Sequence, residues 1–145
     1  MPFAARDDLV LVLRLVLATA LAAAAGWERE QAGKAAGLRT HMLVGLAAAL
    51  YTGIGAIALG QAQSENLRGD PVRIVQAVAL GVGFLGGGSI SVLKSNGHVV
   101  GLTTAASIWA TAAIAIATGM GHYLLAVGAT VLQILVLRAF ERFER

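Results

Sequence analysis

Long apolar stretches separated by short polar segments dominate this sequence. Five apolar segments can be drawn, at 9–26, 42–59, 74–93, 102–118 and 123–138. The last two come from one stretch, 95–137, that contains no Asp, Glu, Lys or Arg. A single helix over that stretch would run about 64 Å at 1.5 Å per residue, twice the ~30 Å core of a bilayer. It must therefore fold back, and 119–122 is the obvious turn, so the pattern predicts five transmembrane helices.

Composition places the chain in the membrane class. Hydrophobic residues make up 57% of the 145 residues and charged residues 13%, with a mean hydropathy of +0.75. Soluble domains average roughly 25% charged residues. An open strand in lipid would leave backbone groups unpaired, and no alternating pattern suggests a barrel. We therefore expect an all-α fold, a polytopic helix bundle forming a single transmembrane domain over 1–145, with the lipid bilayer as its surroundings.

The distribution of basic residues predicts the topology. The net charge is +3 and the pI about 10.0, but the basic residues flank apolar segments, so nucleic acid is not expected as a partner. With five crossings, one side holds Arg6, Arg14, Arg68 and Arg73, and the other holds Arg29, Lys34, Arg39, Lys94, Arg138, Arg142 and Arg145. The positive-inside rule puts the second group in the cytoplasm. The N-terminus is then outside and the C-terminus cytoplasmic.

A polar loop between the first two apolar segments is the strongest candidate for function. Five of the nineteen charged residues (11 basic plus 8 acidic) fall within 26–41. These could be interchangeable charges on a solvated surface. Three glycines, Gly26, Gly33 and Gly37, favour instead a fixed and tightly turned path. Two carboxylates diluted by three cations make a poor metal site, so no metal is expected there.

Glycines and hydroxyls mark the third and fourth segments. The stretch 81–86 fits the GxGxxG pattern of dinucleotide-binding proteins, but it lies inside an apolar run without a βαβ unit, so nucleotide binding is excluded. The glycines at 81–88 suit close helix packing, or alternatively a broken helix that lines a polar cavity. Thr103 and Ser107 share one helix face. Their hydroxyls either bond back to their own helix or face the glycine-rich segment.

The remaining polar features do not suggest an enzyme. Arg14 lies inside the first apolar segment, where it is either a functional charge or a side chain that extends to the membrane surface. The three histidines lack HExxH spacing, and no serine occupies a nucleophile elbow. There is no cysteine for thiol chemistry. We expect no catalytic residue and no cofactor.

Five motifs together resemble the MgtC/SapB family of bacterial inner-membrane proteins. They are GWERE at 26–30, GKAAGLRTH at 33–41, DPVR at 70–73, GFLGGG at 83–88 and GLTTAASIW at 101–109. Their order and separation also fit the family. The best-known members carry a soluble cytoplasmic domain after the last helix, whereas this sequence stops at Arg145, so that domain is not expected here.

The resemblance implies a multi-pass inner-membrane protein linked to magnesium homeostasis and stress adaptation. Part of the family is thought to bind and restrain other membrane proteins, including the ATP synthase, so we expect such a partner and a homo-oligomer. The alternative is an oligomeric transporter or channel for Mg²⁺ or a small solute. Candidate functional residues are, in the polar loop, Glu28, Arg29, Glu30, Lys34, Arg39, Thr40 and His41; in the outer loop and third helix, Asp70, Arg73 and Gln76; and at the helix-packing or cavity surface, Gly83, Gly86, Gly87, Gly88, Thr103, Thr104, Ser107 and Trp109.

Overall fold

The chain folds into five helices and one small hairpin. The structure, a computed structural model, describes residues 2–64, 70–92 and 99–141. In chain order the elements are α1 (Pro2–Gln31), α2 (Leu38–Ser64), α3 (Val72–Gly88), β1 (Ser91–Val92), β2 (Val99–Val100), α4 (Leu102–Gly119) and α5 (Tyr123–Glu141). The predicted all-helical class is confirmed, although the sequence did not predict the two short strands.

Helix bounds differ most from the predicted ones where polar residues or glycines flank the apolar segments. Both α1 and α2 continue beyond 9–26 and 42–59 into polar residues, since Glu, Arg and Gln are good helix formers. By contrast α3 ends at Gly88, before the predicted end at 93, which lies outside the described residues. Three successive glycines weaken the helix there, and the β-branched Ile90 and Val92 follow. Ser91 then pairs with Val100, and Val92 with Val99, in antiparallel register.

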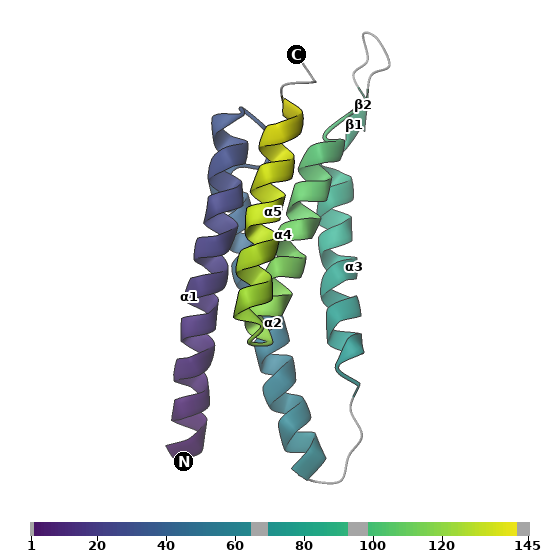
Figure 1. Cartoon of the computed structure of the whole chain (residues 1–145). Coiled ribbons are helices and arrows are strands. Elements are labelled where there is room, and N and C mark those ends of the chain that lie inside the picture. The colour runs from purple at the N-terminus through teal and green to yellow at the C-terminus, as the bar shows by residue number, and fades with distance from the viewer. Residues whose placement is uncertain (1, 65–69, 93–98, 142–145) are drawn as a thin grey trace.

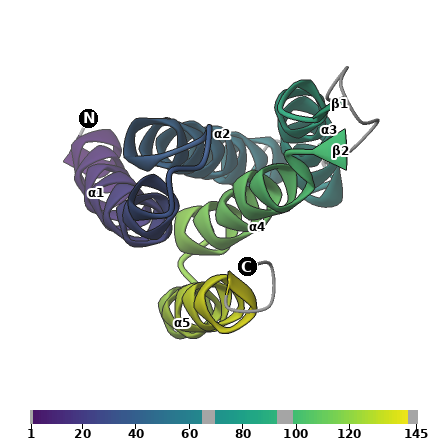
Figure 2. The same cartoon turned by 90° about the horizontal axis from the view of Figure 1, so that it is seen from above.

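The helices lie side by side in an elongated bundle in which α4 is central. It contacts each of the other four helices, and seen from above it runs from α1 to α3, with α2 on one side and α5 on the other (Figures 1 and 2). The α1–α2 turn, the hairpin and the end of α5 share one end of the bundle (Figure 1). The start of α1, the end of α2 and the start of α3 share the other. This is the partition expected from five crossings, while the side that faces the cytoplasm stays a prediction. Four residues that entered the charge count, Arg68, Lys94, Arg142 and Arg145, lie outside the described residues.

Small residues pack the centre of the bundle. Ala18, Ala22 and Ala25 of α1 are buried at spacings of four and three residues, and α2 and α4 bury small residues in the same way. A Cβ on Gly45 would lie 2.6 Å from the Cβ of Ala22, and one on Gly119 would lie 2.8 Å from the Ala49 carbonyl oxygen. Such close approach of helix backbones is typical of membrane proteins. Lipid tails are as apolar as the helix surfaces, so the helices are held together by van der Waals packing rather than by the hydrophobic effect.

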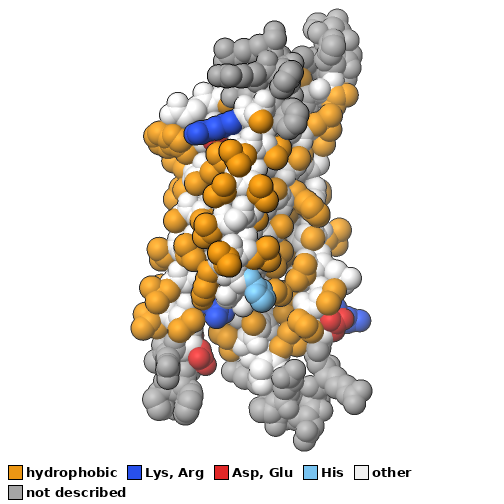
Figure 3. Space-filling view, in the orientation of Figure 1, with side chains coloured by type: hydrophobic (Ala, Val, Ile, Leu, Met, Phe, Trp, Pro, Cys, Tyr) orange, Lys and Arg blue, Asp and Glu red, His pale blue; other side chains and the backbone are white. Residues whose placement is uncertain are grey.

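The outer surface is that of a membrane protein. Three helices are long and apolar enough to cross a bilayer, within Asp7–Gln31, Leu38–Gly60 and Leu102–Gly119, and two shorter apolar helices accompany them. Large apolar side chains cover the outside, as the view in Figure 3 shows, with Phe84 84% exposed and Leu124 89% exposed. A surface of this kind is stable against lipid rather than water.

Candidate functional site

A buried ion pair occupies the last turns of α1. The Arg29 Nε donates to Glu28 Oε2 at 2.8 Å, and its Nη2 donates to Oε1 at 3.3 Å. The two side chains are only 2% and 4% exposed. Arg29 follows Ala18, Ala22 and Ala25 on the same buried stripe of α1, so the helical spacing places its side chain on the face that packs inside the bundle. Pairing keeps both charges from being buried alone, which would be far more costly.

His41, in the first turn of α2, is fully buried beside this pair. Its Nδ1 lies 2.9 Å from the Gly37 carbonyl oxygen and its Nε2 lies 3.1 Å from Ser107 Oγ. A carbonyl oxygen can only accept, so Nδ1 carries a proton. The Ser107 Oγ also lies 2.9 Å from the Thr104 carbonyl oxygen, so its one proton is shared between two acceptors, this carbonyl and Nε2 of neutral His41. Ser107 therefore bonds back to its own helix, as one interpretation of the sequence held, and also links α4 to α2.

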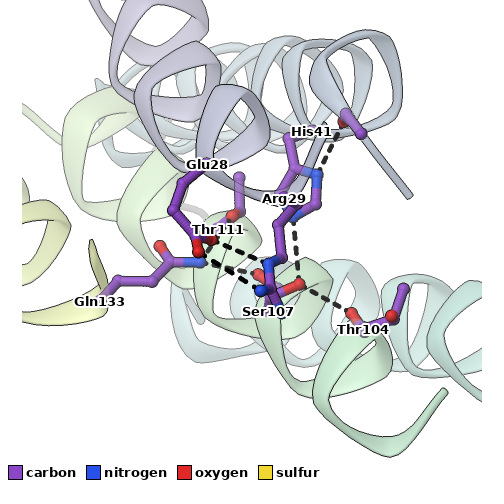
Figure 4. A network of polar contacts seen from close by, with 8 residues as sticks. Glu28, Arg29, His41, Thr104, Ser107, Thr111 and Gln133 are labelled. Atoms are coloured by element: carbon purple, nitrogen blue, oxygen red, sulfur yellow. Dashed lines mark hydrogen bonds and ion pairs between the residues drawn. The ribbon is translucent and has the colours of Figure 1, made fainter. Parts of the chain in front are cut away.

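Gln133 connects α5 to the same place. Its Nε2 donates to the Ser107 carbonyl oxygen and to Thr111 Oγ1, both at 3.0 Å. Its Oε1 is buried and, within the described residues, has no hydrogen-bond partner. Figure 4 shows these side chains converging from α1, α2, α4 and α5. We call this group the polar cluster: Glu28, Arg29, His41, Ser107, Thr111 and Gln133.

Glycines bring the two helices of the polar loop close together. A Cβ on Gly26 would lie 2.9 Å from both His41 Cβ and Leu38 Cα, so α1 and α2 could not cross at this distance with any side chain there. A Cβ on Gly37 would lie 2.7 Å from Glu30 Oε2, which accepts a 2.7 Å hydrogen bond from the Leu38 N–H at the start of α2. Gly33 has a φ of 65°. The connection is thus a defined tight turn, as the three glycines suggested.

The predicted site residues do not form one surface. Glu28, Arg29 and His41 are buried, whereas Lys34 is half-buried and Glu30, Arg39 and Thr40 are exposed. Three others are exposed at the opposite end of the bundle, on or just before α3: Asp70, Arg73 and Gln76. There the Asp70 Oδ1 accepts a hydrogen bond of 2.9 Å from the N–H of Val72, the first residue of α3. The functional roles assigned to these residues stay predictions.

The glycine-rich helix is continuous, so the broken-helix hypothesis is wrong for α3. Backbone helix runs from Val72 to Gly88, and Gly86 packs against α4, where a Cβ would lie 3.4 Å from the Ala105 carbonyl oxygen. Gly83, Gly87 and Gly88 are exposed. On α4, Thr104 and Ser107 are buried while Thr103 and Trp109 are exposed. The Ser107 hydroxyl contacts α2 rather than the glycines, so the polar facet facing α3 is also not observed.

Sequence reasoning missed two members of the polar cluster and one helix-end contact. Thr111 and Gln133 were not singled out. Gln133 follows Ala126 and Thr130 at spacings of four and three residues, and spacings of three and four also place Arg29 on the buried stripe of α1. This repeated spacing is the signal that could have found them. Arg14 donates from Nε to Tyr123 Oη at 3.0 Å and from Nη1 to the Gly119 carbonyl oxygen at 2.9 Å. It thus caps the end of α4 instead of merely extending to the surface.

Comparison with known proteins shows that the sequence is similar to those of several bacterial proteins. The sequence model of the MgtC family matches residues 15–145. YhiD of Escherichia coli (strain K12) is 44% identical over 132 residues, which cover 90% of this chain and 60% of YhiD. SrpB of Synechococcus elongatus is 39% identical over 145 residues (96% and 79%), and MgtC of Salmonella typhimurium (strain LT2) is 34% identical over 138 residues (92% and 55%). The chain therefore spans about 60% of the length of YhiD. No solved structure matches.

Proposed function

Because the chain belongs to the MgtC family, we propose that it is a non-enzymatic protein of the bacterial inner membrane that acts in magnesium homeostasis by binding and modulating another membrane protein. The link to magnesium and the ATP synthase as one candidate partner come from the family resemblance. The N-terminus would lie outside the cell and the polar loop in the cytoplasm. Since several relatives are longer than this chain, the proposal concerns the transmembrane part that they share.

The observation that supports partner binding is an exposed face of α3. Gly83 and Gly87 are four residues apart, both exposed, and a Cβ on either would meet no atom within 4 Å. Leu80 and Phe84 beside them are 79% and 84% exposed. Two small residues at this spacing allow another helix in the bilayer to approach closely. We call Gly83 and Gly87 the α3 glycine face, and its proposed occupant is a helix of the partner protein.

Bulky substitutions on this face test the proposal. Gly83→Leu and Gly87→Leu should reduce recovery of the partner protein, and any self-association, when the chain is purified in native nanodiscs. Gly128→Leu on α5 is the matched control, because that glycine is also helical, exposed and free of atoms within 4 Å of a Cβ. Gly86→Leu would instead disturb packing against Ala105. Unchanged recovery in the double variant G83L/G87L would refute the proposal.

A second candidate function is transport of Mg²⁺ or a small solute by an oligomer. It is favoured by the name of YhiD, which provisionally describes that protein as a magnesium transporter, and by the polar cluster inside a membrane bundle. Both Glu28 carboxylate oxygens are held by Arg29, so an ion could use them only if that pair opened. Mg²⁺ uptake into proteoliposomes separates the candidates. Uptake above that of empty vesicles, lost in Glu28→Gln, would favour transport over partner binding.

A further inference from the structure

An apolar groove of about 770 Å³ runs between α2 and α3. Its walls include Leu43 and Val82, and small residues such as Ala47, Ala77 and Gly81 leave it hollow. A Cβ on Gly81 would meet no atom within 4 Å. Cavities lined by aliphatic side chains stay dry, so in the bilayer this groove must be filled by an apolar group rather than by water.

The groove has the length of one leaflet of the membrane. α2 and α3 run antiparallel here, with Gly55 against Ile74 near the start of α3, and Leu85 lines the far end. From Arg73 to Leu85, twelve residues at 1.5 Å give about 18 Å, whereas half of the hydrocarbon core is ~15 Å. Arg73 lies in the first turn of α3, where a helix enters the bilayer and lipid headgroups are found.

A cationic side chain lines the shallow end of the groove. Among the described residues that line it, Arg73 is the charged one, and its guanidinium forms no ion pair with any residue that the structure describes. The nearby carboxylate of Asp70 accepts a hydrogen bond from the Val72 N–H through Oδ1. Tyr51 on α2 also lines the groove, about one helical turn deeper than Arg73. The groove thus joins a positive charge at headgroup depth to an apolar channel.

We propose that this groove binds an anionic phospholipid, with its phosphate on Arg73 and one acyl chain along α2 and α3. Arg binds phosphate oxygens bidentately through charge-assisted hydrogen bonds. A lipid brings a phosphate to this depth with every molecule, whereas a helix from another protein would need an acidic residue placed to match Arg73. Gly83 of the α3 glycine face is about 200° around the helix from Gly81, so the groove and the proposed partner surface are separate.

Lipid retention tests the proposal with the full chain. The protein is reconstituted in nanodiscs of phosphatidylcholine with or without phosphatidylglycerol, released, and analysed by native mass spectrometry. The wild-type protein should keep phosphatidylglycerol in preference to phosphatidylcholine. Arg73→Gln should lower that retention about tenfold or more, because hydrogen bonds to a charged group are lost. Gly81→Leu, which fills the channel, should lower retention of both lipids.

Two matched controls distinguish the groove from other surfaces. Arg138→Gln removes another exposed arginine, on α5 at the opposite end of the bundle, and Gly128→Leu adds the same bulk outside the groove. Both should keep phosphatidylglycerol as the wild-type protein does. The side chain of Arg73 is exposed, so R73Q folds and remains decisive if G81L does not. Full retention by R73Q would overturn the proposal. So would a homo-oligomer that G81L dissociates while its lipid content is unchanged, because a second copy would then occupy the groove.

Discussion

Replacing Arg29 with methionine removes one partner of the buried ion pair and leaves the Glu28 carboxylate without its two hydrogen-bond donors. Removing one partner from a buried pair destabilises a protein by about 3–5 kcal/mol, since an uncompensated charge stays inside. Both side chains are at least 96% buried, so solvent does little to compensate the charge that remains. We expect Arg29→Met and Glu28→Leu each to lower the free energy of unfolding by this amount.

The double variant gives the sharper comparison. Replacing a buried pair by apolar residues of similar volume is often neutral or stabilising. E28L/R29M should therefore lie within about 1 kcal/mol of the wild-type protein, far from the roughly 6–10 kcal/mol loss that two independent sites would give. The two residues are neighbours in the chain, so their pairing does not by itself hold distant parts of the chain together. Its energetic effect comes from burial against α2, α4 and α5.

Reversible unfolding by SDS in mixed micelles, followed by helical circular dichroism, measures these free energies. Arg39→Met is the control, because Arg39, in the first turn of α2, carries the same charge but is exposed, and it should change the free energy of unfolding by no more than about 0.5 kcal/mol. If R29M lies within about 1 kcal/mol of the wild-type protein, or if the double variant loses the sum of the two singles, the pair is not the buried unit described above.

Three further predictions follow from close contacts. Gly26→Ala should lower the free energy of unfolding by about 1–3 kcal/mol, because its Cβ would overlap His41 and Leu38. Gly128→Ala, the control, should leave that free energy unchanged or raise it by up to about 1 kcal/mol. Equal losses for the two variants in SDS unfolding would contradict this prediction. Neutral His41 should carry its proton on Nδ1, and ¹⁵N chemical shifts that place it on Nε2 would contradict the hydrogen bond to Gly37. Tyr123→Phe should cost about 1 kcal/mol through the lost bond to Arg14, an effect that should vanish when Arg14 is already Gln.

The helices could be predicted from the sequence because lipid leaves few alternatives. A spanning backbone must satisfy its own hydrogen bonds, so an apolar segment of sufficient length becomes a helix whatever it packs against. The fold-back near Gly121 could also be predicted, and Gly121 does adopt a φ of 89° there. The end of α3 could not, since hydropathy continues through Ile90 and Val92 although the glycines have already weakened the helix.

The polar cluster is harder to predict, because charges near a membrane surface are normally solvated. Composition alone cannot tell that Glu28 and Arg29 are buried while Glu30 and Arg39 are exposed. That distinction depends on which residues continue the buried stripe of α1, and on donors and acceptors from helices distant in sequence, such as Ser107 and Gln133. The buried stripe of α1 can be read from helical spacing in the sequence. The donors and acceptors from distant helices are brought together only when the helices pack.

The packing divides the molecule into parts with different sensitivities. α1, α2 and α4 are joined by close glycine and alanine contacts and by the polar cluster, so substitutions there act mainly on folding. The buried residues of α3 are Val78, Val82 and Gly86, which leaves the α3 glycine face and the α2–α3 groove open to other molecules. Variants of α3 should therefore alter binding with little change in stability, and cluster variants the reverse. A cluster variant such as E28L/R29M that keeps full stability but loses its partner would show that the cluster itself takes part in binding.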